Sequence, residues 1–140
     1  MKDCAVRRAG VCAAAAVLVM GGCQLIVPSD GELINLTMVQ WKRALVAKDV
    51  DKMMAVYSED FVSSDGKGKE AARELVEWAI DEGYLDGIEV DLEVAEMEIE
   101  DEEAIFDPVE LEFVSGDRRR YGYTLQKEKG LWRIVRSREY

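Results

Sequence analysis

The chain has 140 residues, of which 49% are hydrophobic and 34% are charged. This composition suits one globular domain with a buried core and excludes a disordered polymer. Its 18 basic and 29 acidic residues give a formal charge of -11. Because such a surface repels phosphate backbones, we expect no nucleic-acid partner. The absence of histidine removes the commonest general base and most zinc sites, so we expect no metal and no cofactor.

Residues 1–22 have the parts of a secretory signal peptide. Three basic residues, Lys2, Arg7 and Arg8, precede the apolar run Val11–Met20, which is too short for a permanent membrane span. Two glycines and Cys23 follow, and this stretch resembles a bacterial lipoprotein signal, although Leu or Val is more usual than Met at position 20. The alternatives are an ordinary signal peptide or an uncleaved anchor.

The lipoprotein resemblance implies that Cys23 becomes the lipid-modified first residue of the mature protein. Cys23 would then be the only cysteine left, so no disulfide could form within one molecule. Several acyl chains would hold the protein at a membrane of the cell envelope, outside the cytoplasm. Gln24 favours the outer membrane if the host has one. Residues 23–31 form the lipidated cysteine and its tether, and residues 32–140 form the domain.

Two helices are predicted at the start of the domain. Ser29 or Asp30 can cap the first, which begins near Glu32. Its apolar residues recur at helical spacing and form the face that we expect to be buried: Ile34, Met38, Trp41 and Leu45. Asp49 or Asp51 can cap a second, shorter helix that carries Tyr57.

A third helix is predicted from Lys69 to Glu82, after the turn-rich segment 63–68. Leu75 and Trp78 lie on its apolar face, and we expect Trp78 in the core. Gly83 follows where a left-handed cap is expected.

From Gly87 onward the hydrophobic period changes from 3.6 to 2, which indicates strands. A long strand is predicted over residues 88–99, with a β-bulge near Ala95 that keeps one face apolar and bends the sheet. The next strand is predicted to begin at Pro108. Turns at 115–117 and 129–130 then lead into two further strands. Helices followed by an antiparallel meander predict an α+β fold, with three helices packed on a curved sheet.

Residues 34–140 resemble the nuclear transport factor 2-like superfamily, specifically its SnoaL-like small proteins. The resemblance is carried by Trp41–Leu45 with Asp49 and Asp51, by Tyr57–Phe61, by Gly68–Glu70 and by Gly130–Ile134. It implies a cystatin-like fold, in which a bent sheet forms a cone around a long helix. It also implies a pocket at the open end in many relatives, and dimers formed through the sheet.

The segment from Asp86 to Glu112 contains many acidic residues and no basic residue. No spacing within it matches a calcium-binding loop. Most of these acids form the polar half of alternating strands, and arginines on the later strands are placed to neutralise some of them. We therefore interpret the segment as a solvated sheet face with cross-strand ion pairs, rather than as a dock for calcium or a basic partner.

Three kinds of function remain open. The first is a non-enzymatic module that binds a partner protein, a second copy, or a small apolar ligand lined by Trp41, Tyr57, Tyr121 and Tyr123. The second is an isomerase, cyclase or hydrolase like some SnoaL-like relatives, with Asp107 as the weak candidate base and Tyr121 or Tyr123 beside it. Because the predicted inward face has no other ionisable group, we favour the non-enzymatic module. A purely structural envelope protein is a third reading.

Overall fold

The structure is a computed structural model that describes residues 26–140. The predicted signal peptide, Cys23 and the start of the tether lie outside the described residues.

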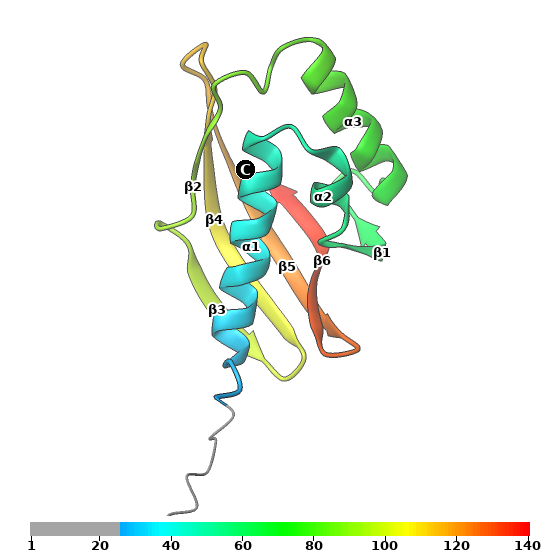
Figure 1. The fold of residues 1–140 in the computed structure, drawn as a ribbon, viewed down its shortest axis with the longest axis vertical. Helices are drawn as coiled ribbons and strands as arrows, with labels where there is room; N and C mark the ends of the chain where they lie inside the picture. Colours follow the sequence, from blue (N-terminus) through cyan, green and yellow to red (C-terminus); the bar gives the residue numbers. More distant parts are fainter. Residues whose placement is uncertain (1–25) are drawn as a thin grey trace, which may run out of the picture.

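Three helices lie on one face of a curved, unclosed six-stranded sheet of order β1-β6-β5-β4-β2, with β3 pairing to β4 beside β2 (Figure 1). The elements are α1 (Asp30–Val46), α2 (Val50–Met54), β1 (Tyr57–Val62), α3 (Lys69–Asp81), β2 (Glu89–Asp91), β3 (Glu96–Glu100), β4 (Glu103–Glu112), β5 (Arg118–Glu128) and β6 (Leu131–Glu139). The predicted α+β class is confirmed. Within residues 26–140, no helix combines the length and the apolar character that a membrane crossing needs.

Side-chain caps start the first two helices where the sequence predicts them. The Ser29 hydroxyl accepts the Glu32 amide at 3.2 Å, and the Glu32 carboxylate accepts the Ser29 amide at 2.9 Å, which completes a capping box. The Asp49 carboxylate accepts the Lys52 amide at 3.1 Å and caps α2. These caps satisfy amides that would otherwise lack partners, so they set the residues at which the chain turns onto the sheet.

Tyr57 does not belong to the second helix. That helix ends at Met54, and Tyr57 begins the edge strand β1, which runs parallel to β6 with Tyr57 opposite Ile134. The prediction was wrong because Met54 and Tyr57 are both buried three residues apart, a spacing that also suits a helix. The pairing with β6 makes this segment a strand, and that pairing joins residues that lie far apart in the sequence.

The predicted long strand over residues 88–99 is two strands. β2 and β3 are separated by residues 92–95, and both pair with β4. Ile88 and Val90 are buried as predicted, whereas Val94 and Ile99 are 44% and 43% exposed. The edge of the sheet is therefore interrupted at Ala95 instead of being bulged there.

The bulge lies in β4. Phe106 pairs with Tyr123 and Val109 pairs with Tyr121, so Asp107 and Pro108 together face the single residue Gly122. Pro108 consequently lies inside a strand that begins at Glu103, and not at its start. An extra residue bends the strand, which contributes to the curvature of the sheet around α1.

One hydrophobic core fills the space between the helices and the sheet. Its largest fully buried side chains are Trp41, Ile34, Met38, Leu125, Ile134 and Val109. Within residues 26–140, the buried apolar residues fall between Ile34 and Val135, so this segment contains a core of its own, which is what independent folding requires.

Helix α3 contributes only partly buried side chains to this core, including Ala72 and Val76. The prediction that Trp78 lies in the core was wrong, because its side chain is 52% exposed.

Candidate functional site

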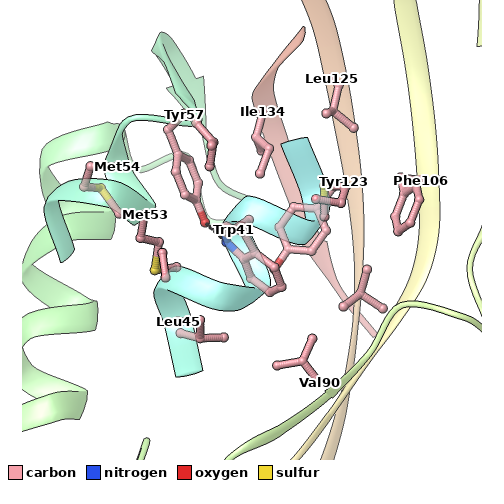
Figure 2. Packing of buried hydrophobic residues seen from close by; sticks show 14 of the residues in the cluster. Trp41, Leu45, Met53, Met54, Tyr57, Val90, Phe106, Tyr123, Leu125 and Ile134 are labelled. Carbon is pink, nitrogen blue, oxygen red and sulfur yellow. Dashed lines mark hydrogen bonds between the residues drawn. The ribbon is translucent and has the colours of Figure 1, made fainter. Parts of the chain in front are cut away.

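The aromatic residues predicted to line a pocket form a closed cluster. Trp41, Tyr57 and Tyr123 are only 1%, 5% and 4% exposed. The Trp41 indole nitrogen donates to the Tyr57 hydroxyl at 3.1 Å, and the Trp41 and Tyr123 rings lie 5.1 Å apart (Figure 2). Among the described residues, no buried side-chain nitrogen or oxygen lacks a hydrogen-bond partner. A ligand could enter this cluster only if its rings moved apart.

Burial changes the acid–base properties of these phenols. It raises the pKa of Tyr57 to about 12, and it raises the pKa of Tyr123 well above the ordinary value. Tyr121 lies at the edge of the cluster, stacked on Tyr123 at 6.3 Å and only partly buried. Burial also raises the pKa of Tyr121. All three phenols are therefore neutral near pH 7, when they can donate hydrogen bonds but carry no charge.

Asp107, the candidate catalytic base, lies on the outer face of the sheet, away from the helices. Its carboxylate accepts hydrogen bonds from the Arg138 guanidinium at 2.7 Å and from the Tyr140 hydroxyl. A β-carbon on Gly122 would lie 2.7 Å from the Asp107 Oδ2 atom, so the carboxylate occupies the space that only a glycine leaves free. The Arg138 guanidinium also donates to the Tyr140 hydroxyl, and this hydrogen bond is the first cause, with the one to Asp107 second, of a raised pKa for Arg138.

The structure does not bring Asp107 together with either candidate tyrosine. Gly122 alternates with Tyr121 and Tyr123 along β5, so the side of the sheet that holds the Asp107 carboxylate is the side opposite both phenols. The charged neighbours of Tyr121 are Arg119 and Glu139, which are joined at 2.9 Å. A proton could not pass between Asp107 and these phenols without crossing the sheet.

Two open depressions occur in the described part of the chain. The larger, of about 500 Å³, lies over the outer face and includes Ser63, Ser64, Ile105, Asp107, Thr124 and Arg136 in its lining. The smaller, of about 410 Å³, lies at the β3–β4 turn against Lys127. In residues 26–140, no three acidic or thiol side chains are grouped as metal ligands. Neither depression has the enclosed apolar lining that a flat hydrophobic ligand needs.

Charged residues are ordered across the outer face. In register, Glu98 of β3 faces Ile105 of β4, Ile105 faces Thr124 of β5, and Thr124 faces Arg136 of β6. Two neighbouring rows have the same polarity and consist of Glu96, Asp107, Gly122 and Arg138, and of Glu100, Glu103, Gln126 and Arg133. Each row begins with a glutamate on β3 and ends with an arginine on β6, so the face has an acidic border and a basic border.

Some of these charges are paired within the chain. Glu110 meets Arg120 at 2.8 Å and Glu112 meets Arg118 at 3.2 Å, which confirms the predicted cross-strand ion pairs. In the central row, by contrast, neither Glu98 nor Arg136 has an ion-pair partner within residues 26–140, and both are exposed. These two residues keep their charges available to a partner.

Four residues of this face are not predicted as site residues from the sequence: Glu98, Gly122, Arg136 and Tyr140. Strand alternation predicts that Glu98 and Arg136 are exposed. Their place in one row depends on the bulge in β4 and on a second register shift between β5 and β6. These shifts leave no clear signal in the local pattern.

Comparison with known proteins identifies the fold. No protein-family model matches the sequence, and no curated protein matches it. A protein of unknown function with a cystatin-like fold from Nostoc punctiforme is 19% identical, with a TM-score of 0.64 over 79% of this chain and 91% of that chain. A nuclear transport factor 2-like protein from Novosphingobium aromaticivorans is 19% identical, with a TM-score of 0.63 over 79% of this chain and 80% of that one. A nuclear transport factor 2-like protein of unknown function from Shewanella baltica is 14% identical, with a TM-score of 0.60 over 77% and 91%. The chain therefore has the nuclear transport factor 2-like, cystatin-like fold.

Proposed function

We propose that this chain is a lipid-anchored, non-enzymatic binding module of the cell envelope that associates with a second copy of itself through the outer face of its sheet. The observation that carries the proposal is the central row from Glu98 to Arg136. Binding would take place on the surface of the domain, because the interior is filled by its own aromatic side chains.

The rows on the outer face are complementary to themselves. In a twofold dimer, each residue i of one copy meets residue j of the other, and j meets i. With the axis between β4 and β5, the two central rows run in opposite directions. Glu98 of each copy then lies opposite Arg136 of the other, and Ile105 lies opposite Thr124. Packed sheets lie about 10 Å apart, which is within reach of paired Glu and Arg side chains.

The interior supports a surface function and gives no support to catalysis. A small apolar ligand would have to separate Trp41 from Tyr57 and Tyr123, which breaks a buried hydrogen bond and a close ring contact. An enzyme of the SnoaL-like kind would need a carboxylate among these rings, and Asp107 lies on the other side of the sheet. Binding through an exposed, ordered face requires neither a separation of these rings nor a carboxylate among them.

Charge reversal tests the dimer. Sedimentation equilibrium of residues 26–140 should give a dimer for the wild type. Arg136→Glu and Glu98→Arg should each raise the dimer dissociation constant at least about tenfold, because each change creates two contacts between like charges. The variant that carries both changes should recover most of the affinity, since the ion pair is rebuilt in the opposite sense.

A monomeric wild type, or a double variant no tighter than either single variant, would refute the dimer. Glu102→Arg serves as the matched control for Glu98→Arg, because it makes the same change in net charge at the β3–β4 turn and should leave the dissociation constant unchanged.

The lipid anchor is tested on the full chain in its host. Cys23→Ser removes the thiol to which lipid would be attached, so the protein should move from the membrane fraction to the soluble extracytoplasmic fraction. A wild type already found in the soluble fraction would refute the anchor but would leave the dimer untouched.

A further inference from the structure

Helix α3 presents an apolar surface that the rest of the described chain does not cover. Leu75, Trp78 and Tyr84 are 63%, 52% and 56% exposed. The ring centres of Trp78 and Tyr84 lie 5.1 Å apart with the ring planes tilted by 33°, and Leu75 lies one turn before Trp78. We call these three residues the α3 patch. Leaving large side chains clustered in water is unfavourable, and clusters of this kind mark sites of interaction.

The α3 patch is not part of the core face of its helix. Ala72, Val76 and Ala79 cover that face and pack against the core. Leu75 and Trp78 lie about a quarter to a third of a turn away from it. The patch also lies on a different part of the domain from the outer face of the sheet, because α3 covers the helical side near β1 (Figure 1).

Acidic residues border the patch, and nearby bases are already engaged elsewhere. Lys69 pairs with Glu59 at 2.6 Å, Arg73 pairs with Asp51 at 3.0 Å, and Lys48 pairs with Asp86. Four acids of the helix and its end have no ion-pair partner within residues 26–140: Glu70, Glu74, Asp81 and Glu82. Glu74 and Asp81 project beside Trp78 on the helical wheel, while Glu82 lies one turn beyond it.

We propose that the α3 patch binds a cationic, amphipathic segment of a partner protein. An aliphatic side chain of that segment would cover Leu75 and Trp78, and its Lys or Arg residues would lie beside Glu74 and Asp81. A cation can also pack over the Trp78 ring, which is the most favourable aromatic face for such a contact. The acidic border selects this occupant, because it repels a second copy of the patch and repels an anionic lipid surface.

The test uses a synthetic 18-residue amphipathic peptide of leucine and lysine, with a peptide of leucine and glutamate in the same order as its control. Residues 26–140 supply the protein. Trp78 is the exposed tryptophan in this segment, whereas Trp41 and Trp132 are 1% and 3% exposed, so acrylamide quenching reports mainly on Trp78. We expect the lysine peptide to bind, to protect Trp78 from acrylamide, and to dissociate as salt rises. We expect the glutamate peptide not to bind.

Substitutions locate the site. Trp78→Ala, and the pair Glu74→Lys with Asp81→Lys, should each weaken binding of the lysine peptide at least about tenfold, measured by calorimetry. Trp78→Phe, which keeps an aromatic ring, should weaken it less and serves as the second variant if Trp78→Ala unfolds. Glu93→Lys with Glu102→Lys makes the same change in net charge at exposed positions away from the patch and should leave binding within about twofold.

Three results would overturn the proposal. Equal loss of affinity in the Glu93→Lys, Glu102→Lys control would show general attraction to an acidic protein. Dissociation of a dimer by Trp78→Ala would show that a second copy covers the patch. A blue shift of Trp78 emission with phosphatidylglycerol vesicles, but not with the lysine peptide, would show that the patch binds a membrane.

Discussion

Tyr57→Phe tests whether the aromatic cluster is closed, and the structure predicts opposite effects at neutral and at high pH. Near pH 7 the substitution removes the acceptor of the Trp41 indole N–H, which donates to Tyr57 at 3.1 Å. A buried donor left without a partner costs about 1–3 kcal/mol. The free energy of unfolding should fall by that amount.

At high pH the wild type loses the stability that depends on a protonated Tyr57 hydroxyl, whereas the phenylalanine variant has no such group to ionise. Burial raises the pKa of Tyr57 to about 12, against a value of 10.0 for an unperturbed tyrosine. The unfolded chain therefore releases this proton first. The contribution of Tyr57 to stability is complete below pH 10 and is lost as the pH rises from 10 through 12. A raised pKa of this size corresponds to about 3 kcal/mol. The variant should therefore approach or exceed the stability of the wild type at about pH 12.

Urea unfolding of residues 26–140 between pH 7 and pH 12, followed by tryptophan fluorescence, measures both effects. Tyr84→Phe is the matched control, since Tyr84 is 56% exposed, and its stability should follow that of the wild type at every pH. Parallel profiles for Tyr57→Phe and the wild type would mean that water reaches the Tyr57 hydroxyl. The cluster would then be open, and the argument against an interior ligand would fail.

Three further predictions concern the sheet bulge, the first cap and the tryptophans. Gly122→Ala should cost about 1–3 kcal/mol of unfolding free energy, because the new methyl group meets the Asp107 carboxylate at 2.7 Å. Adding Asp107→Ser should recover part of that loss in chemical denaturation, and no recovery would contradict the contact. Ser29→Ala should cost about 1 kcal/mol by breaking the capping box, measured by thermal unfolding, and an unchanged midpoint would show that the cap contributes nothing. Trp132→Ala should cost about 3–5 kcal/mol in urea unfolding, whereas Trp78→Ala should cost less than about 1 kcal/mol, and equal costs would contradict the difference in burial.

Elements set by local chemistry could be predicted from the sequence. Ser29 and Asp49 are capping residues that act on amides two or three positions away, so both helix starts were readable. Val90, Leu111 and Leu125 alternate with polar residues, and each is buried on the predicted face. The fold class followed from these local features and agreed with the resemblance to known families, whereas the curvature was predicted from a bulge near Ala95 that the structure has in β4 instead.

Elements set by distant partners could not be predicted. Tyr57 becomes a strand residue because β6 pairs with it, and nothing near Tyr57 in the sequence indicates that pairing. Trp78 lies on an apolar stripe of α3 that is wider than the surface the helix covers, so periodicity alone could not decide which part of the stripe is buried. Asp107 was predicted to share a face with Tyr121 because the strand was read without its bulge.

The bulge in β4 links these errors to the proposed function. A shift of one residue in register moves every following side chain to the other face of a sheet. Without the extra residue at Asp107 and Pro108, Val109 and Leu111 would point outward, and the carboxylate of Asp107 would lose its place over Gly122. The acidic and basic borders would then no longer belong to rows that match under a twofold rotation. The same local irregularity that removes Asp107 from the aromatic interior therefore puts it in a charged row on the outer face, which is the surface that the proposed dimer uses.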